Sequence, residues 1–121
     1  MAQPQGVVKS FDSPDEVRAF EGKGQAHLLD IAGKPVAKVE CEPGWKWSNN
    51  IKPIAKTDSC QVSHLGYCMQ GQMRIYMDDG SQFDISAGDV TAIPPGHDAE
   101  VIGDEAYVGL DFGEVQAFAK G

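Results

Sequence analysis

Residues 73–97 read MRIYMDDGSQFDISAGDVTAIPPGH, and this stretch decides which fold the sequence predicts. It contains three short runs of strand-forming residues, at 73–77, 82–85 and 90–93, and the turn signals DDG, SAGD and PPG follow them in that order. Polar and apolar residues alternate in the first run, a period of two that is typical of a strand with one buried face. A hairpin of short strands is therefore expected here.

The same pattern extends over most of the chain. Further strand-like runs, bounded by turn signals such as AGK, EPG, MQGQ and GDE, lie at 25–31, 36–42, 45–48, 60–69, 99–102 and 107–112. Short strands about ten residues apart are typical of a β-sandwich or a β-barrel. The expected fold class is all-β.

One short helix is expected near the N-terminus. Residues 13–16 (SPDE) combine an N-cap serine, a proline at the first helical position and a capping-box glutamate. The helix would end before Gly22, and Val7–Phe11 ahead of it would form a short edge strand. The whole chain, 1–121, is expected to be one domain, with an N-terminal strand and helix extension at 1–34, a barrel at 35–112 and a tail at 113–121.

Composition excludes several classes of function. Asp and Glu number 18 against 10 Lys and Arg, which gives a net charge of −8 and a surface that repels nucleic-acid phosphates. No apolar run reaches the ~18 residues of a membrane span, and the first residues lack the pattern of a secretory signal. The three cysteines, Cys41, Cys60 and Cys68, are an odd number, which argues against a disulfide scaffold and favours the reducing cytoplasm.

Residues 49–59 interrupt the strand rhythm without a clear strand of their own. A loop of this length is uncommon in a small domain and is often functional, although a plain surface loop is the alternative.

Two histidines and a cysteine, residues of metal-ligand type, lie where strands are expected to point into the barrel. His64 shares strand parity with Cys60, Val62, Gly66 and Cys68, which predicts an inward, mostly apolar face, and His97 begins the next strand after the PPG turn. Imidazole and thiolate are ligands that zinc prefers. The alternative for each histidine is a hydrogen-bonded core residue.

The motifs around these residues resemble those of the cupin superfamily, small β-barrels that often hold one metal ion. GDVTAIPPGH (88–97) is similar to the second cupin motif, G-x5-P-x-G followed by a metal-binding histidine. HLGYCMQG (64–71) is similar to the end of the first motif, in which an acidic ligand stands seven residues before a glycine. The head of that motif, G-x5-H-x-H, can be placed on 44–52. The blocks CEPGWKW, KPIAKTDSCQVSHLGY and IPPGHDAEVIGDE resemble a group of small bacterial cupins of undefined activity.

The chain departs from the cupin pattern at the ligands themselves. Asn50 and Lys52 occupy the positions of the two early histidines, and His64 occupies that of the acidic ligand. The resemblance therefore implies a divalent metal on His64 and His97, with Cys60 as the expected third ligand. Zinc is the first expectation, with iron, nickel or manganese as alternatives. Along a straight strand Cys60 and His64 would lie roughly 13 Å apart, so Cys60 can contribute only if the chain bends sharply.

Five further residues are candidates for the wall of a ligand pocket: Asn50, Trp45, Trp47, Tyr67 and Tyr76. The tryptophans are equally compatible with core packing, and strand tyrosines commonly pack across strands.

Three functions fit these observations. The first is a metal-dependent enzyme acting on a small molecule, the second is a non-catalytic module that binds or senses a small ligand, and the third is a degenerate barrel used for dimerisation. A homodimer is expected in each case, because an open barrel leaves strand edges that need cover.

Overall fold

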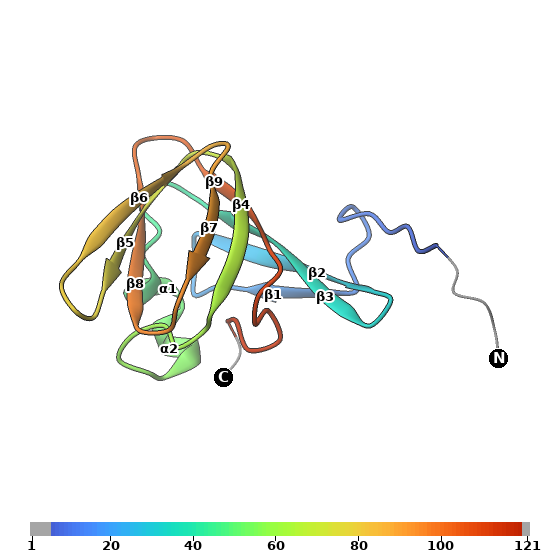
Figure 1. Cartoon of the computed structure of the whole chain (residues 1–121), viewed down its shortest axis with the longest axis horizontal. Helices are drawn as coiled ribbons and strands as arrows, with labels where there is room; N and C mark the ends of the chain where they lie inside the picture. Colours follow the sequence, from blue (N-terminus) through green and yellow to red (C-terminus); the bar gives the residue numbers. More distant parts are fainter. Residues whose placement is uncertain (1–5, 120–121) are drawn as a thin grey trace.

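The computed structural model describes residues 6–119, which fold into two antiparallel sheets, so the all-β prediction is confirmed. A six-stranded sheet has the order β1-β2-β3-β9-β4-β7, and a three-stranded sheet has the order β6-β5-β8 (Figure 1). The elements in chain order are β1 (Glu16–Ala19), β2 (Gly24–Ile31), β3 (Lys34–Cys41), α1 (Trp47–Asn50), α2 (Lys52–Ala55), β4 (His64–Gln70), β5 (Gln72–Met77), β6 (Gln82–Ser86), β7 (Val90–Ile93), β8 (His97–Ile102) and β9 (Tyr107–Asp111).

The hydrophobic core lies between the two sheets, because alternate residues of each strand point inward. In β8 the inward set is His97, Ala99 and Val101, all less than a tenth exposed. Ile75 of the adjacent strand β5 and Ile85 of β6, the next strand in the sheet, belong to the same core and are almost fully buried. The period of two seen in the sequence is thus the alternation between core and solvent.

The predicted N-terminal helix is wrong: Glu16–Ala19 form strand β1, paired with β2. Arg18 and Phe20 are buried while Val17 is half exposed, which is a strand period and not a helical one. The Asp15 carboxylate accepts the backbone N–H of Asp30 at 2.8 Å, so this part of the capping sequence joins β1 to β2 instead of capping a helix. Pairing with β2 therefore overrides the local capping signal.

The predicted edge strand at Val7–Phe11 is also wrong, because these residues lie outside every strand and Val8 is almost fully exposed.

The segment between β3 and β4 is more ordered than the sequence predicts. The expected strand at 45–48 and loop at 49–59 are replaced by the short helices α1 and α2. Pro53 stands in the first turn of α2, where its missing N–H costs nothing, and Lys56 ends the helix in the left-handed conformation. β4 begins at His64, so the expected strand from Cys60 starts four residues later than predicted. No helix within residues 6–119 is long and apolar enough to cross a membrane.

Candidate metal centre

A bend between Cys60 and His64 brings the cysteine to both histidines. Cys60 forms an isolated antiparallel bridge with His97, in which the Cys60 N–H donates to the His97 carbonyl at 2.7 Å. Gly96, with φ 93°, is the PPG glycine that turns the chain into His97, and its N–H donates to the Cys60 carbonyl at 2.7 Å. The chain then crosses to β4, where the alternation of that strand points His64 inward. The sharp bend that Cys60 requires is therefore present.

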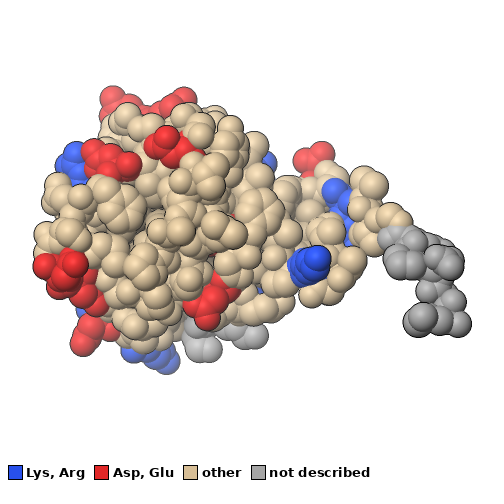
Figure 2. Space-filling model, in the orientation of Figure 1, with Lys and Arg blue, Asp and Glu red and all other residues tan. Residues whose placement is uncertain are grey.

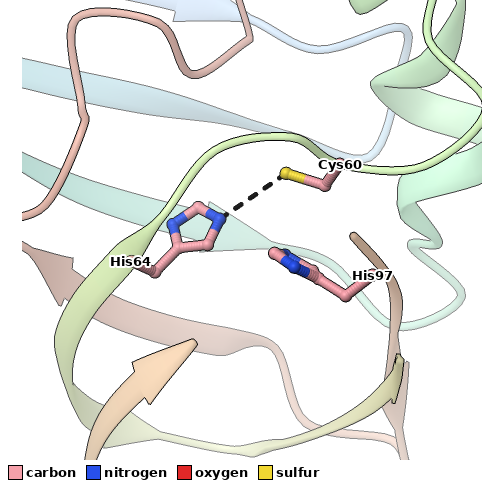
Figure 3. Close-up of side chains that lie close together, drawn as sticks. All are labelled: Cys60, His64 and His97. Atoms are coloured by element: carbon pink, nitrogen blue, oxygen red, sulfur yellow. Dashed lines mark hydrogen bonds between the residues drawn. The ribbon is translucent and has the colours of Figure 1, made fainter. Parts of the chain in front are cut away.

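The potential ligand atoms of Cys60, His64 and His97 all lie within 4.8 Å of one another (Figure 3). Cys60 Sγ is 3.6 Å from His64 Nε2, and the two imidazole centroids are 5.2 Å apart. A tetrahedral zinc ion with ordinary Zn–S and Zn–N bonds holds sulfur and nitrogen about 3.5 Å apart. The residues present therefore fit a zinc-sized ion.

Hydrogen bonds at the far side of each ring fix which nitrogen is available to a metal. His64 Nδ1 lies 2.5 Å from Asp111 Oδ2, and the other Asp111 oxygen accepts the Gly113 N–H at 2.9 Å. His97 Nδ1 donates to the Pro94 carbonyl at 2.9 Å. Both imidazoles are thereby oriented with Nε2 on the side away from these partners, and His64 Nε2 faces Cys60 Sγ. This is the arrangement found around metal-ligating histidines.

The same contacts create a thiolate–imidazolium pair. Burial alone raises the pKa of the Cys60 thiol, but hydrogen bonds and charge from His64 and His97 outweigh it and lower that pKa to about 6. Burial alone lowers the pKa of His64, but the Asp111 and Cys60 contacts outweigh it and raise that pKa to about 9. Near neutral pH the metal-free site therefore carries a thiolate beside an imidazolium.

Cys60 is expected to be alkylated faster than Cys41 or Cys68 in metal-stripped protein. Burial raises the pKa of both other thiols, so only Cys60 is largely thiolate at neutral pH. Labelling with a small alkylating reagent such as iodoacetamide, followed by mass spectrometry, measures this. The Cys60 rate should increase as the pH is raised through about 6 and then level off. Equal labelling of the three cysteines would contradict the assignment.

The site opens onto a cavity of about 70 Å³ inside the barrel. Its wall includes His64, His97, Trp45 and Trp47, so both predicted tryptophans line it. The Phe118 ring packs edge-on against His64, with centroids 5.6 Å apart, and closes that side of the cavity. This volume admits a few water molecules or a small organic ligand.

Three of the predicted pocket residues, Asn50, Tyr67 and Tyr76, are not among the residues that line this cavity. Asn50 is a structural residue: its Oδ1 accepts the Lys46 N–H and its Nδ2 donates to the Glu21 carbonyl. Tyr67 is 42% exposed on the outer face of β4. The Tyr76 hydroxyl donates to Glu100, which lies diagonally across from it on the outward-facing side of β5 and β8.

Two residues of the site were missed by sequence analysis. Asp111 shares inward parity with Gly109 in β9. An aspartate at an inward position of a predicted strand was the signal available in the sequence. Phe118 gave no local signal, because it follows the last strand.

Searches by sequence find no matching family model and no matching curated protein. Solved structures do match. A sugar phosphate isomerase of the cupin superfamily from Silicibacter pomeroyi has TM-score 0.58 and 21% identity over 89% of this chain and 73% of its own. A double-stranded β-helix protein from Klebsiella pneumoniae has TM-score 0.57 and 17% identity over 88% of each chain.

A formate complex of oxalate decarboxylase from Lactobacillus farciminis matches with TM-score 0.56 and 23% identity over 79% of this chain. The chain spans only 30% of the length of that enzyme and 27% of another oxalate decarboxylase. These likenesses, with the two antiparallel sheets, show that the chain has a double-stranded β-helix fold.

Proposed function

We propose that the protein binds one divalent metal ion, zinc by its donor set, through Cys60, His64 and His97, and that a small organic molecule occupies the adjoining cavity. The observation that carries this proposal is the convergence of three ligand atoms within 4.8 Å. One thiolate and two imidazoles suit zinc, whereas a non-haem iron site commonly adds a carboxylate ligand. The unpaired state of all three cysteines supports the cytoplasm as the proposed compartment.

Three protein ligands leave a fourth position, and that position would face the cavity that His64 and His97 line. A bound ion would supply Lewis acidity there. Asp111 would hold the His64 ring in its ligating tautomer, and Phe118 would keep bulk water away from His64. The chain's own groups would thus bind the ion, orient the His64 ligand and keep bulk water away from it, with one position left open to the cavity.

The metal test is a measurement of bound zinc after loading and dialysis. The wild-type protein is expected to retain one ion per chain, and His64→Ala and His97→Ala are expected to retain almost none. His27→Ala is the matched control, since His27 lies on β2 and does not line the cavity. In Co²⁺-loaded protein, a thiolate charge-transfer band that disappears in Cys60→Ser would identify the sulfur ligand. A folded wild-type protein that retains no metal would contradict the proposal and favour a metal-free ligand-binding module or a dimerisation unit.

A second candidate activity follows from the order Cys60–His64–Asp111, which resembles the nucleophile, base and orienting carboxylate of thiol acyl-transfer enzymes. The Cys60 sulfur would attack an activated ester, take its acyl group and release the alcohol. Metal-stripped protein treated with 4-nitrophenyl acetate would then carry an acetyl group on Cys60 by mass spectrometry. Absence of that adduct excludes this activity and leaves the metal site unaffected.

We propose a homodimer formed through the outer face of β4, β7 and β9, which lie side by side in one sheet (Figure 1). Large apolar residues are exposed on this face or at its end: Leu65, Tyr67, Met69, Val90 and Phe112. Charged side chains border it on β3, where Lys38 approaches Glu40 at 3.6 Å. Acidic groups occupy several other places on the barrel (Figure 2). An apolar centre with a charged border suits a self-complementary interface.

Light scattering at moderate salt is expected to give about twice the chain mass of 13.0 kDa for the wild-type protein. Tyr67→Lys is expected to give monomer, because it would bury a charge in the interface. Val8→Lys, at a position 95% exposed and outside this face, is the matched control and should remain dimeric. A wild-type mass near 13.0 kDa would contradict the dimer.

A further inference from the structure

Two hydroxyl groups on the wall of the cavity have no hydrogen-bond partner in the protein. They belong to Tyr107 of β9 and Thr91 of β7, which both line the cavity and are half-buried. No group among residues 6–119 bonds to either hydroxyl, yet in that range only the Trp45 indole nitrogen is both fully buried and without a partner. The Tyr107 and Thr91 hydroxyl oxygens are therefore not fully buried and keep accessible surface.

Two glycines place these hydroxyls on the core side of the sheet. The Tyr107 hydroxyl oxygen lies 2.7 Å from where a Cβ of Gly109 would be, and Gly109 is buried on the same inward face of β9 as Asp111. Thr91 pairs with Gly66 of β4, and its Oγ1 lies 3.5 Å from where a Cβ of Gly66 would be. Because Gly66 and Gly109 also line the cavity, the accessible surface of both hydroxyls faces into it.

The hydroxyls lie on the same wall as part of the candidate metal centre. Thr91, Gly66 and Asp111 form one row across β7, β4 and β9, and His64 lies two residues from Gly66 on the same face of β4. Apart from His97, the residues that the three-stranded sheet contributes to the cavity are apolar: Met73, Ile75, Ile85 and Ala99. An occupant of the cavity therefore meets hydroxyl groups on one side and hydrocarbon on the other.

The Tyr107 phenol is a hydrogen-bond donor at any physiological pH. Burial, and after it the charge that Cys68, Cys41 and Asp111 can carry, raises the pKa of the phenol, so the hydroxyl stays protonated. The Thr91 hydroxyl can both donate and accept. A ligand oxygen that accepts from Tyr107 gains a bond that no protein group supplies, whereas a purely apolar ligand would leave both hydroxyls without a partner.

The charges around the cavity favour a neutral occupant. None of the lining residues within 6–119 is a lysine or an arginine, whereas the Asp111 carboxylate is among them. A divalent ion at the site would itself be offset by the Cys60 thiolate and by Asp111 behind His64. A carboxylate ligand would therefore leave water for an apolar wall without a compensating cation.

We propose that the cavity binds a short uncharged alcohol or carbonyl compound, and that Tyr107 and Thr91 determine this specificity by hydrogen-bonding to its oxygen. The hydrocarbon part of the molecule packs against the aliphatic wall, and the volume of about 70 Å³ limits it to a few heavy atoms. This assignment deepens the proposed function by naming the ligand class, and it rests on that proposal only for the metal ion beside the ligand.

The test compares three small probes. Acetone supplies an uncharged acceptor, acetate has the same number of heavy atoms and a negative charge, and xenon binds apolar cavities without hydrogen bonds. Binding is followed through the methyl signals of Ile75, Ile85 and Ile93, which line the cavity, in metal-stripped and in zinc-loaded protein. Metal-stripped wild-type protein is expected to bind acetone at least about tenfold more tightly than acetate.

Tyr107→Phe, which removes only the hydroxyl oxygen, is expected to weaken acetone binding about tenfold and not to weaken xenon binding. Thr91→Val, of similar shape, is expected to weaken acetone binding about threefold. Tyr67→Phe is the matched control, since Tyr67 is 42% exposed on the outer face of β4, and it should change neither affinity.

Tyr107→Phe is also expected to leave the urea midpoint of unfolding unchanged or to raise it, because its hydroxyl has no protein partner to lose. A lower midpoint or a failure to fold would show a structural role for the hydroxyl and overturn the proposal. Tighter binding of acetate than of acetone to metal-stripped protein, no binding of acetone, or an acetone affinity unchanged in both Tyr107→Phe and Thr91→Val would also overturn it. If the protein proves to bind no zinc, the metal-stripped series remains a valid test, so the two proposals fail separately.

Discussion

The affinity of the protein for Zn²⁺ is expected to rise about tenfold for each pH unit between about pH 6 and about pH 9. Within this range the metal-free site holds the Cys60 thiolate and the His64 imidazolium, so zinc must displace one proton, from His64. Below about pH 6 the Cys60 thiol is also protonated, so the zinc affinity depends more steeply on pH. Above about pH 9 no proton remains to be displaced from His64, so the zinc affinity no longer changes with pH. Across the range the change amounts to roughly 1000-fold.

Competition with a chelator of known zinc affinity, measured at each pH, gives these slopes. Asp111→Asn is the matched variant, because the Asp111 carboxylate raises the pKa of His64. The zinc affinity of this variant should stop rising at a pH below about 9, even if its highest value is also lower than that of the wild-type protein. A pH-independent affinity between pH 6 and pH 9 would show that His64 does not lose a proton to the metal.

Replacing Arg18 with methionine is expected to lower the free energy of unfolding by about 3 kcal/mol. The Arg18 guanidinium is buried, and its Nη1 donates to the carbonyls of Val115, Gln116 and Phe118 at 2.9, 3.2 and 2.7 Å. Methionine fills similar volume but leaves these carbonyls without a donor. Urea denaturation monitored by circular dichroism measures the loss.

Arg74→Met is the control for the loss of one arginine. Arg74 pairs with Asp84 at 2.8 Å, but both side chains are more than a third exposed, so the expected change is below about 1 kcal/mol. Arg18→Lys keeps the charge without the planar set of donors and should fall between the two. Equal losses for Arg18→Met and Arg74→Met would show that the carbonyl contacts contribute little.

Sequence periodicity predicted the strands best where local pattern and turn chemistry agree. Residues 73–97 form β5, β6 and β7 within one residue of the expected bounds, because alternation and glycine turns are local properties. The N-terminal helix failed for the opposite reason. Its SPDE sequence is a sound capping signal, but pairing of Arg18 with Ala26 across the turn decides the conformation. The capping signal is a property of residues 13–16 alone and does not include this pairing.

The part of the candidate site that lies in local motifs could be predicted from the sequence. The positions of His64 and His97 follow from strand parity and from the PPG turn, and the structure brings both to Cys60. The parity of β9 could have pointed to an inward Asp111, but its contact joins residues 47 apart in the chain, so only the pairing of β4 with β9 shows that it reaches His64. Asn50 was assigned to the pocket from its motif position alone, whereas its side chain is hydrogen-bonded to Lys46 and Glu21.

The contacts of Arg18 also impose an order of events during protein synthesis. Val115 follows Arg18 by 97 residues and Phe118 follows it by 100, so a ribosome needs roughly five to twenty seconds to deliver these partners. His97, the last of the three potential ligands, emerges before Phe118. A nascent chain therefore passes through an interval in which all three potential ligands exist and the ring that packs against His64 does not. A metal ion delivered in that interval would meet a more open site than one added to the finished protein, in which Phe118 already lies against His64.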